Sequence, residues 1–417
     1  MTLIRRLFQK CTGLLGLGIG LPVALVLRAI RPIVEVRYGF FFVDRIGHFV
    51  FDLEYHLSEL ALNPKRNRQI DLFFLEGDVC NVALANMMKR QLLINPLVRY
   101  LFKAEELIPG RRCLIYPARM RSGSTDHTGV FSSTPVQLRF STDEEREGEH
   151  YLRSLNCRLD AKIVCLIVRD STYLDTTRPG KNWRYHSYRD TSLENYASTA
   201  LMLAKKGYWV FRMGKVVEKR FNLKHPRIVD YANSESRSDL LDVWLLARCF
   251  FTISTSTGLD SVADAFRKPI AFVNFLPLAW FQTWTHCVLA PCHLYWHDSG
   301  RELTCEEHFA NSYLRTADYE AAGIEVKELS GDEIVEVVGE LDNELASAEL
   351  SNLEDQGEQE EFRKLLRQTL GGGLDFGVMS VLPQACRVPS ADNVRINRNA
   401  RLSRTFLDKA PYFLNLQ

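Results

Sequence analysis

FFTISTSTGLDSVADAFRKPIAFVNF, which spans Phe250 to Phe275, contains two patterns in alternation. Its two ends, Phe250–Ser254 and Ile270–Phe275, are continuous apolar runs with the length and composition of buried strands. Between them, Gly258–Phe266 has the apolar spacing of a helix, which ends before Pro269. A strand, a helix and a second strand in this order predict a unit of parallel α/β structure.

The same alternation continues upstream, and it predicts a Rossmann-like half. Thr191 and Glu194 predict a capping box at one helix start, and Gly207 predicts the end of that helix. A long loop with many aromatic residues, Arg169–Asp190, separates the first strand from this helix. The predicted strands and helices are strand Ile163–Val168, helix Thr191–Lys206, strands Tyr208–Met213 and Arg227–Tyr231, and helix Ser238–Arg248.

A second α/β pattern lies nearer the N-terminus, before a polar, turn-rich stretch at residues 117–148. Its predicted elements are strand Tyr38–Val43, helix Phe49–Leu62, strand Ile70–Leu75, helix Asn81–Leu93 and strand Leu114–Tyr116. The predicted fold class is therefore α/β, with two Rossmann-like domains that face a cleft. The expected parts are an N-terminal segment over residues 1–33, domains over 34–150 and 151–335, and an acidic helix with a basic tail over 336–417.

The composition bounds the class of protein. The chain has 417 residues, which predicts more than one domain, and 46% of them are hydrophobic. Lys plus Arg number 52 and Asp plus Glu 51, so the net charge of +1 gives no general attraction for nucleic acid. The 10 cysteines include no Cys-x-x-Cys pair and predict reduced thiols in a cytoplasmic protein.

The N-terminus is basic around an uncharged stretch. Arg5, Arg6 and Lys10 precede Cys11–Leu27, and Arg28 follows it. This stretch contains several glycines and falls short of the roughly 20 apolar residues of a transmembrane helix. We favour an anchor that lies on the membrane surface. The alternatives are a single spanning signal-anchor and a glycine-rich helix packed on the domain, and a signal peptide would lack a cleavage site after Leu27.

The C-terminal part combines an acidic segment with a basic one. Glu340–Glu361 contains no basic residue, and its leucines recur at loosely helical spacing, which predicts a solvated amphipathic helix. Gly371-Gly372-Gly373 then breaks the chain. The arginine-rich stretch Arg387–Arg404 predicts a surface arm or an arm that folds back over a cleft.

The turns that follow the predicted strands are the candidate ligand-binding segments, because open parallel sheets bind ligands beyond the carboxyl ends of their strands. They are Asp44–His48, Glu76–Asp78, Arg169–Ser171, Arg212–Gly214 and Thr255–Asp260.

One group of these residues predicts an anion site. Ser254, Thr255, Ser256, Thr257 and Gly258 combine small side chains and hydroxyls at a predicted helix start, which suits a phosphate or diphosphate. Arg169 and Arg212, each at a strand end, can grip phosphate in a bidentate manner, with Gly214 and Asp260 in the same turns. The alternatives are a simple helix cap and structural ion pairs.

A second group predicts general-base chemistry. His48 titrates near neutrality without any shift, which suits a base that removes a hydroxyl proton. Asp44 is the competitor, as the base itself or as the residue that orients His48, while Arg45 and Gly47 shape the turn. The alternative is a capping or ion-paired turn.

No metal site or cofactor is predicted. The spacing of the histidines and cysteines near the second domain's end fits no standard zinc motif, and no Asp-x-Asp occurs that would hold a divalent metal with a diphosphate. These histidines and cysteines are His286, Cys287, Cys292, His293, His297, Cys305 and His308.

Taken together, these residues resemble a bacterial family of GT-B glycosyltransferases. The Ser254–Leu259 and Arg267–Ile270 segments are similar to the donor site of lipopolysaccharide heptosyltransferases, where Asp-Thr-Gly-x-x-His precedes Lys-Pro; Ser256 and Ser261 replace the Asp and the His. Arg45–His48, Arg169-Asp170, Tyr185–Asp190 and Arg212–Gly214 resemble a family found with surface-polysaccharide genes, over about Tyr38 to Leu329.

The resemblance implies an acceptor-binding N-terminal domain and a donor-binding C-terminal domain, with the chain's end crossing back to the first. It implies metal-independent sugar transfer from a nucleotide sugar to a glycan or glycolipid hydroxyl at the cytoplasmic face of the cell membrane. Tyr185, His186, Tyr188 and Arg189 would close over donor or acceptor. The alternatives are a nucleotide-sugar epimerase or hydrolase, and a catalytically silent scaffold that binds a partner at the membrane.

Overall fold

The computed structural model of the chain describes most of its residues. The described ranges are 16, 18–64, 68–110, 113–169, 172, 176, 184–282, 284–347, 356–371 and 394–415. The basic residues Arg5, Arg6 and Lys10, most of the predicted loop Arg169–Asp190 and the start of the arginine-rich tail lie outside these ranges.

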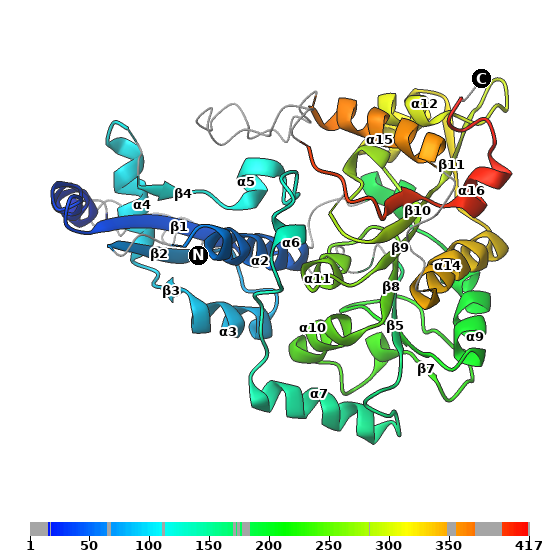
Figure 1. Ribbon diagram of the computed structural model, residues 1–417, viewed down its shortest axis with the longest axis horizontal. Coiled ribbons are helices and arrows are strands. Elements are labelled where there is room, and N and C mark those ends of the chain that lie inside the picture. The colour runs from blue at the N-terminus through cyan, green and yellow to red at the C-terminus, as the bar shows by residue number, and fades with distance from the viewer. Residues whose placement is uncertain are drawn as a thin grey trace. The chain divides into compact units, whose positions relative to one another are not determined.

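The chain forms two compact units. Unit 1 holds the chain up to Thr125 together with Gln137–Arg139, and unit 2 holds Asp126–Val136 and most of the chain from Phe140 onward. The domain boundary predicted near residue 150 falls inside helix α7 (Thr142–Ser154) of unit 2. Both units are α/β structures built on parallel sheets (Figure 1).

Unit 1 is a four-stranded parallel sheet in the order β3-β2-β1-β4, flanked by helices. Its elements are β1 (Glu35–Phe42), α2 (Ile46–Leu62), β2 (Gln69–Glu76), α3 (Val82–Gln91), β3 (Leu93–Ile94), α4 (Val98–Leu107), β4 (Leu114–Ile115) and α5 (Ala118–Ser122). The predicted elements of this half are confirmed, with ends shifted by a few residues.

The two faces of β1 explain why its second half, Tyr38–Phe42, is a continuous apolar run. Tyr38 and Phe40 lie in a cluster that includes Val98 and Phe102 of α4, while Phe41 contacts the His56 ring of α2 edge to face. A parallel strand that is covered on both faces buries every side chain, so it shows no polar alternation.

A helix over residues 18–29 precedes β1 and packs on α4 through glycines. A Cβ at Gly20 would lie 2.9 Å from the carbonyl oxygen of Tyr100, and one at Gly16 would collide with the Tyr100 ring. The described part of the N-terminus therefore packs on unit 1 through its glycines. No helix among the described residues has the length and apolar character needed to cross a membrane.

Unit 2 is built around a seven-stranded parallel sheet, with a two-stranded antiparallel sheet beside it. Helices α7, α10 and α11 lie on one side of the large sheet, and α9 and α14 lie on the other (Figure 1). The strands are β5 (Ile163–Ile167), β6 (Trp209–Arg212), β7 (Ile228–Val229), β8 (Phe251–Ser254), β9 (Ile270–Phe275), β10 (Cys287–Pro291), β11 (His293–Trp296), β12 (Ile324–Lys327) and β13 (Ala400–Leu402).

The helices of unit 2 begin mostly at residues that can cap them. Ser238 and Ser330 accept hydrogen bonds from backbone N–H groups in the first turns of α10 and α14. The helices are α6 (Val130–Ser133), α7, α9 (Ala197–Lys205), α10 (Asp239–Arg248), α11 (Asp260–Ala265), α12 (Cys305–Ala310), α13 (Thr316–Ala321), α14 (Gly331–Ala346), α15 (Gln356–Gly371) and α16 (Arg404–Lys409). The 3-10 helices are η1 (Arg184–Arg189), η2 (Leu193–Tyr196), η3 (Tyr231–Asn233) and η4 (Leu278–Trp280).

The order of the large sheet, β13-β10-β9-β8-β5-β6-β7, has a switch in direction between β5 and β8. From β5 the chain adds β6 and β7 on one side, and it then returns to place β8 on the other side of β5. Parallel sheets of this kind bind ligands in the crevice beyond the carboxyl ends of the two strands at the switch. The predicted Rossmann-like sheet is confirmed. Its strand order makes the carboxyl ends of β5 and β8 the expected place for a ligand.

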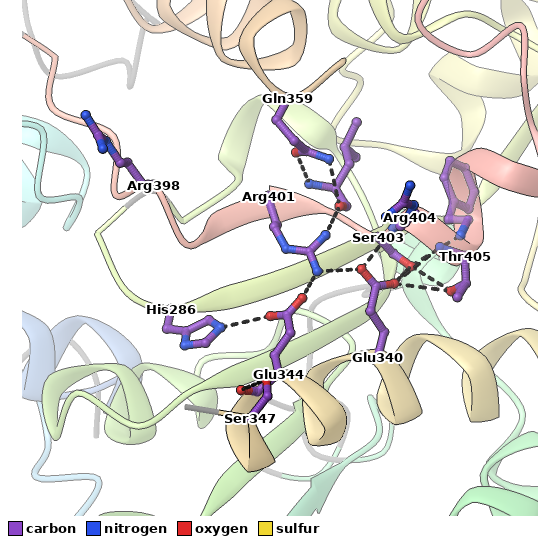
Figure 2. A network of polar contacts seen from close by, with 12 residues as sticks. His286, Glu340, Glu344, Ser347, Gln359, Arg398, Arg401, Ser403, Arg404 and Thr405 are labelled. Carbon is purple, nitrogen blue, oxygen red and sulfur yellow. Dashed lines mark hydrogen bonds and ion pairs between the residues drawn. The ribbon is translucent and has the colours of Figure 1, made fainter. Parts of the chain in front are cut away.

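The acidic segment and the basic tail meet at the edge of the same sheet. Glu340 and Glu344 of α14 both form ion pairs with Arg401 of β13, which pairs with β10 (Figure 2). The prediction of a solvated acidic helix is wrong for these two carboxylates, because only 10% and 11% of their side-chain surface is exposed and both pair with the last strand.

Two other sequence predictions also need correction. Thr191 and Glu194 form no capping box, because the Thr191 hydroxyl bonds the Tyr196 hydroxyl and Ser192 bonds the Glu194 carboxylate. The described part of the C-terminal tail, residues 394–415, belongs to unit 2, where β13 completes the sheet. These residues are therefore part of the sheet and not a surface arm.

Candidate functional site

Unit 1 places His48 at the start of a hydrogen-bonded chain that ends in a buried carboxylate. His48 Nδ1 lies 2.8 Å from Ser124 Oγ, and Ser124 Oγ donates to Asp52 Oδ1 over 2.9 Å. Asp52 Oδ1 also accepts from the backbone N–H of Arg119 at 2.9 Å, and Asp52 is 1% exposed. His48 and Asp52 are one turn apart on α2, so both point to the same side of the helix.

The direction of these bonds assigns the proton on His48. The Ser124 hydroxyl has one proton, and it uses this proton in the hydrogen bond that it donates to Asp52. Ser124 Oγ must then accept from His48 Nδ1–H, which leaves Nε2 of the neutral ring with its lone pair. The arrangement therefore presents His48 Nε2 as a proton acceptor.

The two ends of the chain have opposite pKa shifts. Burial, followed by the positive charges of Arg119 and Arg45, lowers the pKa of His48 to about 3. Burial raises the pKa of Asp52 to about 7. His48 is therefore neutral throughout the neutral range, and the expectation that it titrates near neutrality is wrong, while Asp52 changes its charge there.

The other predicted residues of this turn lie close to His48. Asp44 Oδ1 lies 3.7 Å from the Arg119 guanidinium, which also stacks on the Phe42 ring. Arg45 is exposed at the N-cap of α2, and Gly47 is buried. Asp44 is thus engaged by an arginine, whereas the contact with Ser124 orients the His48 ring, so the geometry favours His48.

Unit 2 brings a second group together at the carboxyl ends of β5 and β8. Arg169 follows β5, and its backbone N–H donates to Thr255 Oγ1 at 2.9 Å, which ties the two strand ends together. Arg189, at the end of η1, donates from its guanidinium to the carbonyl oxygen and the hydroxyl of Ser256. Burial and the neighbouring charge of Arg169 lower the pKa of Arg189 to about 10, so two cations meet at the switch point.

The turn after β8 divides into a buried half and an exposed half. Ser254 and Thr255 are buried, and Asp260 Oδ2 accepts from Ser254 Oγ at 2.6 Å and from Thr257 N–H at 2.7 Å. Asp260 thereby accepts hydrogen bonds from Ser254 and Thr257, which were predicted to donate to a ligand. Ser256, Thr257 and Gly258 remain at least partly exposed, and Ser256 has a positive φ of 60° that turns the chain sharply.

Arg212 and Gly214 lie at the end of β6, away from the switch. The Arg212 side chain is 2% exposed, and NH1 donates to Asp230 Oδ1 at 3.3 Å. Gly214 has a φ of 155°, and a Cβ there would meet Val217. The prediction that Arg212 grips phosphate is not supported by this position, and we assign the residue to the fold.

The predicted lid residues lie in η1. Tyr188 is buried and packs on Tyr319 with ring centroids 5.1 Å apart, while its backbone N–H donates to Thr316 Oγ1. The side chains of Tyr185 and His186 lie outside the described parts of the structure. Arg189 is the member of this set that reaches the turn after β8.

The histidines and cysteines near the end of unit 2 are spread among separate contacts. His286 bonds Glu344, His293 lies between Glu302 and Glu333, and His308 packs on Phe413. In the described part of the chain, no three His, Cys, Asp or Glu residues are grouped in a way that could hold a metal ion.

Sequence reasoning found His48 but missed Ser124, Asp52 and Arg119. One signal was available, because His48 and Asp52 are four residues apart on a predicted helix. Ser124 gave no such signal, since it lies in a polar stretch 72 residues from Asp52 and has a positive φ of 62°.

Comparison with solved structures finds glycosyltransferases, among them the heptosyltransferases that the donor segment resembles. The glycosyl transferase family 9 structure from Veillonella parvula matches with 10% identity and a TM-score of 0.41, covering 62% of this chain and 86% of that one. The E. coli ADP-heptose heptosyltransferase II matches with 16% identity and a TM-score of 0.32, covering 58% and 85%. The iron-containing dodecameric glycosyltransferase TibC of enterotoxigenic E. coli matches with 14% identity and a TM-score of 0.37, covering 76% and 78%.

No protein-family model and no curated protein matches the chain. Likenesses at these TM-scores decide neither the donor nor the acceptor, so the function has to be inferred from the residues of the two groups.

Proposed function

We propose that the protein is a GT-B-type glycosyltransferase that moves a sugar from a nucleotide-activated donor to a hydroxyl of a glycan or glycolipid in cell-surface polysaccharide synthesis. One observation carries the proposal. Arg169, Arg189 and the Ser256–Gly258 turn gather at the switch point of a Rossmann-like sheet, the place where such sheets bind nucleotides.

The donor side of the reaction follows from the two arginines. A nucleoside diphosphate leaves the anomeric carbon with the electron pair of the broken C–O bond, so negative charge grows on the phosphate oxygens. Guanidinium groups held in place stabilise that charge without reorganising during the reaction. Arg169 is 13% exposed in its side chain, and Asp190 fixes it over 3.2 Å.

The acceptor side needs a group that removes a proton as the new C–O bond forms. In the proposal, the acceptor hydroxyl donates to His48 Nε2, and the proton on Nδ1 can pass through Ser124 to Asp52. The carboxylate with a pKa of about 7 is the final acceptor of this chain. This ordered chain favours an enzyme over a catalytically silent scaffold.

We expect Arg189→Ala to weaken nucleotide-sugar binding by about 1.5–3 kcal/mol, the cost of losing one charged hydrogen-bonding group. Calorimetric titration of the purified variant measures this loss. Arg158→Ala is the matched control, because Arg158 is an exposed arginine of unit 2 that pairs only locally with Asp160. Equal donor affinity of Arg189→Ala and Arg158→Ala would remove Arg189 from the donor site.

The pH dependence tests the proposed proton chain. Ionised Asp52 accepts from Ser124, whereas protonated Asp52 can donate to it, which reverses the chain and places the ring proton on His48 Nε2. We therefore expect kcat/KM to rise with pH through about 7, where Asp52 ionises. Asp52→Asn should remove this limb of the profile while the protein stays folded. The same limb in both proteins would show that another group controls the rate.

A donor panel tests the function as a whole. A ligand of the native state raises the melting temperature by mass action, so UDP-, GDP-, CMP- and ADP-linked sugars can be screened with the intact chain. We expect one nucleotide class to raise the melting temperature, and the Arg189→Ala variant to reduce that rise. If no nucleotide sugar stabilises the protein, the proposed donor site is wrong. Hydrolysis or epimerisation of the donor without any acceptor would favour the alternative enzymes.

A further inference from the structure

The helix over residues 18–29 is held in one rotation about its own axis. Its glycine face lies on Tyr100, and Ala24 is 1% exposed on the same side. Arg28 extends this contact, because its guanidinium donates to Glu105 Oε1 at 2.6 Å and to the Pro109 carbonyl oxygen at 2.8 Å. These contacts fix the rotation of the helix, so its opposite side faces away from unit 1.

That opposite side carries a row of large apolar side chains, here called the apolar ridge. Its members are Ile19, Val23 and Val26 of the helix and Ile30 and Ile33 of the turn that follows it, and they are 64%, 40%, 61%, 38% and 65% exposed. They follow one another at steps of four and three residues, the spacing of one helical face. Soluble chains rarely leave a continuous apolar surface of this kind uncovered.

The charges of the N-terminal sequence indicate what covers the apolar ridge. No acidic residue occurs before Glu35, while Arg5, Arg6 and Lys10 precede the helix in the sequence. Two further basic residues of this region are already paired, Arg28 with Glu105 and Arg31 with Glu35. The segment therefore combines an apolar helix face with net positive charge, the combination that binds anionic lipid surfaces.

We propose that the apolar ridge docks on an anionic lipid bilayer, with the helix lying along the headgroup region and unit 1 behind it. The glycine contacts with Tyr100 then hold unit 1 close to the membrane instead of leaving it on a flexible tether. This inference deepens the membrane setting of the proposed glycosyltransferase, but it stands whether or not the protein transfers sugar. A second copy of the chain is the competing occupant of the ridge.

Vesicle flotation of the full chain tests the proposal. The probes are vesicles of phosphatidylcholine alone and of phosphatidylcholine with phosphatidylglycerol. We expect the chain to float with the anionic vesicles. The double variant Val26→Glu with Ile30→Glu should lose vesicle affinity by at least about tenfold, because it places charge on the face that would enter the bilayer. Val82→Glu is the matched control, since Val82 is 56% exposed in the same unit on α3 and should leave flotation unchanged.

Three outcomes would overturn the proposal. The double variant could float as well as the unaltered chain. A wash with about 0.5 M salt could release all of the protein, which would assign binding to screened charges alone. Finally, the unaltered chain could stay off vesicles and form a dimer in light scattering that the double variant does not form, which would assign the ridge to a second copy.

Discussion

His48→Ala is expected to lower kcat by about 10²- to 10⁴-fold while leaving donor affinity nearly unchanged, since a positioned base contributes a factor of this size. The physical reason is the fixed tautomer. Ser124 accepts from His48 Nδ1–H, so Nε2 alone can take the proton of the acceptor hydroxyl. Alanine removes this acceptor and leaves the arginines of unit 2 in place.

Single-turnover rates and calorimetric donor titration of the same variant separate the two effects. Ser124→Ala should cost less than His48→Ala, because the ring remains but the tautomer is no longer fixed. Asp44→Asn is the decisive control, because Asp44 is the rival base and already faces Arg119. Near-normal turnover of His48→Ala beside an inactive, folded Asp44→Asn would transfer the role to Asp44. Partial rescue of His48→Ala by added imidazole would support a chemical role for the ring.

If both variants stay active, the base lies elsewhere, but the neighbouring Asp126 is a poor candidate. Its carboxylate is buried and accepts from the backbone N–H groups of Gly129, Val130 and Phe131. A carboxylate engaged in this way holds a turn together and has no free direction toward a substrate.

The sheet of unit 2 could be predicted because its strands are short, apolar and regularly separated by helices. The stretch from Phe250 to Phe275 states this alternation most clearly, and β8, α11 and β9 follow it. The sequence pattern does not show which hydroxyls of the turn after β8 remain available to a ligand. Asp260 is close in sequence to Ser254 and Thr257, yet only the folded turn shows that its carboxylate accepts from both.

The role of Arg212 and Arg189 illustrates a second limit. Arg212 was predicted to grip the donor phosphate, whereas Arg189 was predicted only as a residue that closes over donor or acceptor. The strand order separates them, because β6 lies beside β5 on the side away from β8. Arg212 is thus buried beside Asp230, while Arg189 is carried by η1 to the turn after β8. Sheet order depends on long-range pairing, which a local pattern does not encode.

The acidic segment shows the same limit for burial. Its leucine spacing predicted a helix over Glu340–Glu361, of which α14 covers only the part up to Ala346. An amphipathic pattern also does not say which acids face solvent. Glu340 and Glu344 are one turn apart, and their shared partner Arg401 is distant in sequence. The basic tail that supplies Arg401 was read as an arm because its short strand carries too few apolar residues to be recognised.

Arg401→Met is expected to lower the free energy of unfolding by about 3–5 kcal/mol, the cost of removing one partner from a buried ion-pair network. The Arg401 side chain is 8% exposed, and those of Glu340 and Glu344 are 10% and 11% exposed. Glu340 keeps hydrogen bonds from Ser403 and from the backbone N–H groups of Arg404 and Thr405, as Figure 2 shows. Among the described residues, the Glu344 carboxylate then keeps its hydrogen bond with His286.

Because His286 is neutral, the loss of Arg401 would destabilise Glu344 more than Glu340. Burial, followed by the charge of Arg401, lowers the pKa of His286 to about 4, so the ring offers Glu344 a hydrogen bond without a compensating charge at neutral pH. Methionine at position 401 therefore leaves a buried carboxylate beside a neutral ring. Adding Glu344→Gln should recover part of the lost stability, because it removes the unpaired charge while keeping a polar group near His286.

Urea unfolding at two pH values measures the effect and its cause. The deficit of Arg401→Met should be largest at about pH 8 and smaller at about pH 4, because protonation of the carboxyl groups removes the unpaired charge as the pH falls. Arg367→Met is the matched control on α15: its side chain is 37% exposed and pairs with the exposed Glu360, so its loss should stay below about 1 kcal/mol. Equal losses in the two variants would mean that β13 is held by its backbone bonds to β10 and by Gln359, whose amide bonds Leu402 on both backbone atoms. An unequal loss with no dependence on pH would assign the effect to packing of the arginine stem and not to its charge.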